Sequence, residues 1–104
     1  MDWIPLYQES QLAEIRQKSF SRAQVILKYS VLCSLSATIK ARLDRSETTE
    51  NADFYWLDLI RYRSISNKIA ETYGVQHKSP QALTIRNGQC VYHESHMGIS
   101  MEKI

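Results

Sequence analysis

Cysteine, glycine and proline are all scarce in this chain of 104 residues, which contains two cysteines, three glycines and two prolines. A small secreted domain stabilised by disulfides usually carries more cysteines, so free thiols are the better interpretation. With few glycines and prolines, and without a repeat or a low-complexity segment, no stretch is typical of a linker. We therefore expect a single domain over residues 1–104 with one modest core.

The chain also lacks a strong charge of one sign and any long apolar run. Thirteen basic and eleven acidic residues give a formal net charge of +2, whereas nucleic-acid binding needs a concentrated basic face. No apolar run approaches the roughly 20 residues that span a bilayer. The first residues, MDWIPLYQES, include an acid and no basic stretch, which makes a poor signal peptide. We expect a cytoplasmic protein without nucleic-acid or membrane partners.

Helical and strand patterns alternate along the chain. Helical spacing of apolar residues marks 10–18, the segment after Cys33 and 65–73, the last of which stops at Gly74. Short apolar runs predict strands over 25–29, 54–60, 82–85 and 90–93, and Asn87-Gly88 is the type I′ hairpin sequence. Two strands joined through a helix should be parallel. The order predicts an α/β fold, with a mixed central sheet of four or five strands and helices on both faces.

Cys33 stands between a predicted strand and a predicted helix, in the stretch SVLCSLSA. A lone cysteine is more often a buried small side chain than a nucleophile. At a helix N-terminus, however, free N–H groups stabilise the thiolate and lower the thiol pKa. Ser36, three residues further on, could donate its hydroxyl to the sulfur. The residues around Cys33 alone leave both interpretations open.

The segment from Tyr73 to Gly88 resembles the second half of a thioredoxin, with a helix ending in Tyr-Gly-Val, a loop, a proline, an apolar strand and an Arg-Asn-Gly turn. Across nearly the whole chain the sequence is similar to the monothiol bacilliredoxin family of the bacillithiol system. The shared positions are Trp3, Lys28, Cys33 with Ser36, Leu57-Asp58, Ser66-Asn67, Ile69-Ala70-Glu71, Ser79-Pro80-Gln81-Ala82-Leu83, Asn87-Gly88, His93, Ser95-His96 and Gly98-Ile99. The family usually has Cys-Pro-Ile-Ser in its active loop, where this chain has Cys33-Ser34-Leu35-Ser36.

The resemblance implies a thioredoxin-like fold and a monothiol thiol–disulfide oxidoreductase with Cys33 as nucleophile. It further implies a loop of Ser34, Leu35 and Ser36, a cis bond before Pro80, and Ser79 as a substrate-positioning residue. The small thiol would be bacillithiol, a co-substrate rather than a bound cofactor. The partners would be bacillithiolated proteins, from which Cys33 removes the small thiol.

Cys90 and the histidines have weaker claims to a role. Cys90 is either a packed apolar side chain, which is the simpler interpretation, or a resolving thiol for Cys33. The second role requires the sulfur atoms of Cys33 and Cys90 to approach within disulfide distance. The spacing of the three histidines matches no zinc pattern, so no metal is expected. His96 follows the last strand, where glutaredoxins bind the anionic end of glutathione, and the resemblance makes it a candidate for the malyl group of bacillithiol. Further candidates for that charge, all expected to be solvated surface residues, are Lys28, Arg61, Arg63 and Lys78.

Two other classes of function stay open from the sequence. Ser34 in place of the usual proline is compatible with a non-catalytic thioredoxin-like protein-binding module. Iron–sulfur carriage, as in monothiol glutaredoxins, would need a loop that Ser34 and Leu35 do not match.

Overall fold

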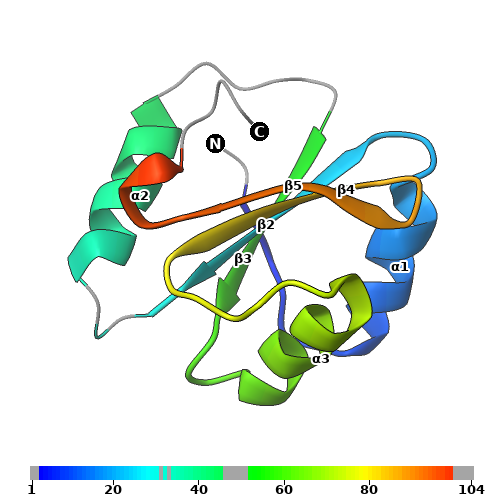
Figure 1. Cartoon of the computed structure of the whole chain (residues 1–104), viewed down its shortest axis with the longest axis horizontal. Coiled ribbons are helices and arrows are strands. Elements are labelled where there is room, and N and C mark those ends of the chain that lie inside the picture. The colour runs from blue at the N-terminus through cyan, green and yellow to red at the C-terminus, as the bar shows by residue number, and fades with distance from the viewer. Residues whose placement is uncertain (1–2, 31, 33, 46–51, 100–104) are drawn as a thin grey trace.

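The computed structural model describes residues 3–30, 32, 34–45 and 52–99. Strands and helices alternate along this part of the chain (Figure 1). They are β1 (Trp3–Pro5), α1 (Ser10–Lys18), β2 (Ala23–Tyr29), α2 (Ser34–Arg45), β3 (Ala52–Asp58), α3 (Arg63–Tyr73), β4 (Gln81–Arg86), β5 (Gln89–Ser95) and the 3-10 turn η1 (His96–Gly98). None of the helices in these ranges is long and apolar enough to cross a membrane.

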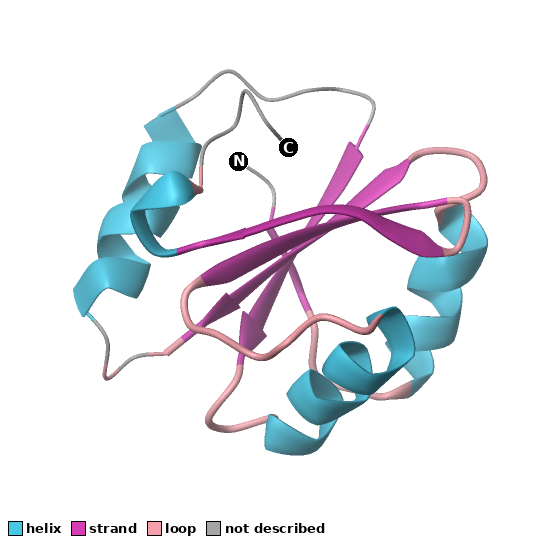
Figure 2. Cartoon of the chain, viewed as in Figure 1, coloured by secondary structure: helices cyan, strands magenta, loops and turns pink. Residues whose placement is uncertain are grey.

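The sheet is mixed and has five strands in the order β1-β3-β2-β4-β5. β1 and β2 run parallel to β3, whereas β4 is antiparallel to β2 and β5 is antiparallel to β4. Helix α2 covers one face of the sheet, and α1 and α3 cover the other (Figure 2). The predicted mixed sheet with helices on both faces is therefore confirmed. Strand β1 was not predicted, because three residues at a sheet edge are too short to show an alternating pattern.

The core has one apolar layer on each face of the sheet. Ile26 and Leu83 face α1 and α3, where they pack with Ile15 and Ile69. On the other face, a smaller cluster joins the strands to α2 and consists of Leu27, Ile39, Leu43, Ala82 and Ile99. β2 lies in the middle and is buried along almost its whole length. Its position explains why it carries the β-branched apolar run by which it was predicted.

The C-cap of α3 and the hairpin turn between β4 and β5 both have the conformation that the sequence predicts. Helix α3 ends at Gly74, whose φ of 64° is the left-handed conformation that favours glycine at a helix C-cap. The β4–β5 hairpin turns at Asn87 and Gly88, which have φ values of 53° and 75°. Positive φ at both central residues is the signature of the predicted type I′ turn.

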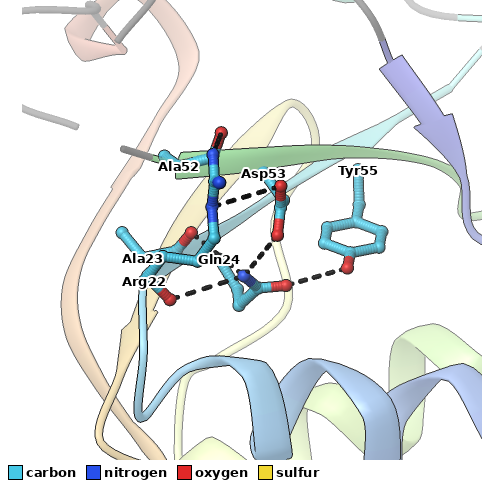
Figure 3. A network of polar contacts seen from close by, with 6 residues as sticks. All are labelled: Arg22, Ala23, Gln24, Ala52, Asp53 and Tyr55. Atoms are coloured by element: carbon cyan, nitrogen blue, oxygen red, sulfur yellow. Dashed lines mark hydrogen bonds and ion pairs between the residues drawn. The ribbon is translucent and has the colours of Figure 1, made fainter. Parts of the chain in front are cut away.

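A polar network closes the end of the sheet where β2 and β3 begin (Figure 3). The fully buried Gln24 accepts a hydrogen bond from Tyr55 Oη at 2.8 Å and donates to Asp53 Oδ2 at 2.8 Å. Arg22 Nε lies 3.4 Å from Asp53 Oδ1. Burial raises the pKa of Tyr55 to about 12, so its hydroxyl stays a donor at neutral pH. This end of the sheet is thus fixed by hydrogen bonds, and the other end carries the candidate site.

Candidate active site

The candidate site lies where β2 ends and α2 begins. β2 ends at Tyr29 and α2 starts at Ser34, the residue that follows Cys33 in the sequence. Cys33 itself lies outside the described residues. Its described neighbours, Ser30, Leu32 and the first turn of α2, therefore define the site.

A pair of hydrogen bonds holds the loop before α2. The Ser30 N–H donates to Ser36 Oγ at 3.1 Å, and the Leu32 N–H donates to Ser30 Oγ at 3.2 Å. Ser36 is 2% exposed, whereas Leu32 is 85% exposed. Ser36 was expected to interact with sulfur, and sequence reasoning missed its role as the acceptor that fixes Ser30. A hydroxyl that accepts one hydrogen bond keeps its own proton to donate.

The other two loop residues differ in their surroundings. Ser34 is exposed, and its carbonyl accepts a hydrogen bond from Thr38 Oγ1 at 3.3 Å. Leu35 is partly buried against the apolar cluster between α2 and the sheet. The first turn of α2 is therefore anchored by Leu35 and Ser36 and presents Ser34 to solvent.

The Ser79–Pro80 segment lies at the same end of the sheet. Its peptide bond is cis, and Pro80 is buried. β4 begins directly afterwards with Gln81, which pairs with Lys28 near the end of β2. The pairing of β2 with β4 thus brings together two motifs that are far apart in the sequence. The buried Ser79 Oγ has no hydrogen-bond partner among the described residues.

His96 follows β5 and joins this end of the sheet through its backbone. Its N–H donates to the Pro80 carbonyl at 3.0 Å, and its side chain is exposed. The His96 N–H is thus engaged with the Pro80 segment at the start of the three-residue turn η1. A role of His96 in substrate binding stays a prediction.

Lys28 is buried beneath the site, contrary to the expectation that it is a solvated surface residue. Its side chain is fully buried, and Nζ donates to the Ser66 carbonyl of α3 at 3.1 Å. Ser66 Oγ lies 3.0 Å from His77 Nδ1. Burial lowers the pKa of Lys28 to about 8, and the pKa of His77 is lowered by burial and then by the charges of Lys28 and Arg63. In the sequence, the sign that Lys28 is buried is its position within an apolar run of strand length.

Cys90 lies at the other end of the sheet. It pairs with Ile85, which pairs with Gln24 at the start of β2. Four residues of strand, about 13 Å, separate Gln24 from Lys28. A disulfide requires Cα atoms within about 7 Å, so this register disfavours an intramolecular bond from Cys90 to the loop after β2.

The surroundings of Cys90 match those of a packed side chain. Cys90 is partly buried against the core, and its Sγ donates to the Tyr92 carbonyl at 3.3 Å. Burial raises the pKa of this thiol. Within the described ranges, no group of three His, Cys, Asp or Glu side chains could hold a metal ion.

Solved structures similar to this chain share the thioredoxin fold. A candidate oxidoreductase with a thioredoxin fold is 27% identical, with a TM-score of 0.83 over 96% of this chain and 88% of that one. Thioredoxin from Schistosoma mansoni is 20% identical, with a TM-score of 0.72 over 91% of this chain and 83% of that one. Thioredoxin from Trypanosoma brucei brucei is 18% identical, with a TM-score of 0.75 over 91% of this chain and 79% of that one.

These likenesses define the class: a protein of the thioredoxin fold. Within that class, residues 4–104 match the family model described as monothiol bacilliredoxin BrxC. The chain belongs to the monothiol bacilliredoxin family, as the sequence motifs predicted. Family and fold together support a redox function for this protein.

Proposed function

We propose that the protein is a monothiol oxidoreductase that removes bacillithiol from protein mixed disulfides, with Cys33 as the nucleophile. The observation that carries the proposal is the start of a 12-residue helix directly after Cys33, at the end of the sheet where Ser79–Pro80 lies. The first N–H groups of a helix have no partner within it, and together with the dipole they stabilise an anion. A thiolate at position 33 would receive this stabilisation.

The reaction is a thiol–disulfide exchange without net oxidation. The Cys33 thiolate attacks the bacillithiol sulfur of the mixed disulfide. A bond forms between Cys33 and bacillithiol, the bond to the substrate protein breaks, and the released protein thiolate takes up a proton from solvent. A second bacillithiol thiolate then attacks the adduct, which frees Cys33 and yields the bacillithiol disulfide.

Ser36 supports the monothiol form of this cycle. It occupies the position where a two-thiol loop would carry its second cysteine, and its oxygen is bonded to the Ser30 N–H. Cys90 lies at the distant end of the sheet. Release of bacillithiol from Cys33 therefore requires a second small thiol. A reducing compartment such as the cytoplasm would supply it.

Mass spectrometry of a transfer reaction tests the proposal. A peptide bearing bacillithiol in mixed disulfide is incubated with the wild type, Cys33→Ala and Cys90→Ala proteins. We expect the mass of bacillithiol on the wild type and on Cys90→Ala, and none on Cys33→Ala. Equal transfer to wild type and Cys33→Ala, or transfer to neither, would contradict the assignment of Cys33.

A docking module without catalysis is the second candidate, and the 85% exposure of the Leu32 side chain favours it. The two functions predict different thiol chemistry. An enzyme needs a Cys33 pKa clearly below the value of about 8.5 for a free thiol, because the thiolate is the attacking species. We expect the midpoint of iodoacetamide alkylation of Cys33 in the Cys90→Ala protein to lie below pH 7.5. A midpoint near 8.5 with slow exchange would identify the docking module.

A further inference from the structure

A pocket of about 210 Å³ opens between the loop before Pro80 and the end of β5. It is lined by Gln76, Lys78, Gln81, His93, Glu94 and Ser95. Its size suits part of a ligand rather than a whole drug-sized molecule. Of its lining residues, only Lys78 was a candidate for ligand binding from the sequence.

Gln81, one of the residues that line the pocket, carries a buried hydrogen-bond acceptor. The residue is 1% exposed, and its Nε2 donates to the Gln76 carbonyl at 2.9 Å. A carbonyl only accepts hydrogen bonds, so the amide group of Gln81 must turn its nitrogen toward Gln76. The remaining Oε1 is buried and has no donor among the described residues. A buried oxygen of this kind costs free energy unless a ligand or a water molecule donates to it.

The strand register places this acceptor beside the Cys33 end of β2. Lys28, Gln81 and Ser95 pair directly across β2, β4 and β5, so their side chains share one face of the sheet. Lys28 precedes Cys33 by five residues in the sequence. Pro80, whose carbonyl holds the His96 N–H, directly precedes Gln81. The pocket thus flanks the candidate active site.

The side chains at the pocket define what it could bind. Gln81 Oε1 requires a donor, such as a hydroxyl group. The exposed Lys78 supplies a positive charge that favours a carboxylate. Glu94 also lines the pocket; its Oε1 accepts the Ser95 N–H at 3.0 Å, which leaves its other carboxylate oxygen able to accept a hydrogen bond from a ligand hydroxyl. Hydroxyl groups next to a carboxylate are the chemistry of a hydroxylated sugar acid or glycoside.

We propose that this pocket is the subsite for the sugar of the small-thiol co-substrate, with a sugar hydroxyl donating to Gln81 Oε1 and the malyl carboxylates near Lys78. The proposal rests on the proposed function, because bacillithiol joins its cysteine to a malyl glucosaminide. Gln81 is then a specificity residue that distinguishes bacillithiol from thiols without a sugar.

Selectivity between two mixed disulfides tests the subsite. One peptide carries bacillithiol and a second carries cysteine, and the transfer rate to Cys33 is measured for wild type and Gln81→Met. We expect Gln81→Met to slow transfer of bacillithiol by about 3- to 10-fold, the value of one hydrogen bond, and to leave transfer of cysteine unchanged. Equal slowing of both transfers would show that Gln81 contacts the peptide or supports folding. No slowing would show that its Oε1 is bonded to water and not to the sugar. Either result overturns the proposal.

Thr84→Val is the matched control. Thr84 also lies on β4, is 2% exposed and has a buried Oγ1 without a partner among the described residues, but it does not line the pocket. We expect this variant to keep the wild-type ratio of the two rates. A loss of selectivity equal to that of Gln81→Met would show that the effect is not local to the pocket and would overturn the proposal.

Binding without chemistry separates this inference from the proposed function. The sulfur-free malyl glucosaminide is titrated into ¹⁵N-labelled wild-type protein, and the side-chain amide signals of Gln81 are followed. We expect these signals to shift with saturation, and the shift to be absent for Asn67, a surface amide on α3. Shifting signals without transfer to Cys33 would overturn the proposed function alone, and unshifted signals would overturn the subsite.

Discussion

Lys28 is the residue at which the structure departs furthest from an ordinary core. Its ammonium group is fully buried and, within the described part of the chain, its one hydrogen bond goes to a helix carbonyl. Moving a charge out of water is costly unless an opposite charge accompanies it. No carboxylate among the described residues forms an ion pair with Lys28. The lowered pKa of about 8 follows directly from this burial.

Lys28→Met should therefore stabilise the protein. We expect a gain of roughly 1–4 kcal/mol in the free energy of unfolding at pH 7, because methionine fills similar space without a charge. The Ser66 carbonyl keeps its place within α3, so the loss of one donor should be minor. Urea denaturation of both proteins measures the difference. A destabilised variant would show that the hydrogen bond to Ser66 outweighs the cost of burial.

The same pair of proteins should differ in pH dependence. Lys28 has a pKa of about 8 in the folded chain and 10.5 as its ordinary value. Between these pH values the unfolded chain binds more protons, so the contribution of Lys28 to stability rises with pH. Below pH 8 both states are protonated and the full cost of burial is present. The advantage of Lys28→Met should thus shrink between pH 8 and pH 10.5, and an advantage that is constant with pH would contradict the assigned pKa.

At the scale of single elements, the C-terminal cap of helix α3 allows a test of how much backbone conformation contributes to stability. It ends at Gly74 in the left-handed conformation, and a Cβ at this position would meet no atom within 4 Å. Gly74→Ala should cost about 1 kcal/mol for purely conformational reasons. Gly74→Asn should cost less, because asparagine tolerates this conformation better. Thermal unfolding of the two variants gives the comparison, and equal effects would point to a steric cause instead.

The elements also show what the sequence could and could not predict. The three helices, the hairpin turn and the parallel pairing of β2 with β3 each have a local pattern, and each was predicted. β1 has three residues and depends on pairing with Phe54 to Trp56, for which no local pattern exists. The burial of Lys28 and the polar surroundings of Gln81 depend on contacts with α3 and across three strands. Such long-range contacts cannot be derived from spacing along the chain.

For the whole molecule, the strand order predicts a gradient of local stability. β2 is bonded on both sides, to β3 and β4, whereas β1 and β5 are the edges of the sheet. Local opening is easiest where few buried contacts hold a segment. We expect amide hydrogen exchange to be slowest in β2 and faster in β1 and β5. Protection of β5 equal to that of β2 would contradict this gradient and would indicate a partner on that edge.

The hydrogen bond from the Ser30 N–H to Ser36 Oγ limits how this protein could change its chemistry during evolution. Ser36→Cys would create a two-thiol loop in one step, but sulfur is a weak acceptor. The buried Ser30 N–H would lose its partner, at a cost of about 1–3 kcal/mol. A two-thiol descendant would therefore be less stable than this chain unless a second substitution near Ser30 supplied a new partner for that N–H. The present loop thus disfavours a single-step change from the one-thiol to the two-thiol form.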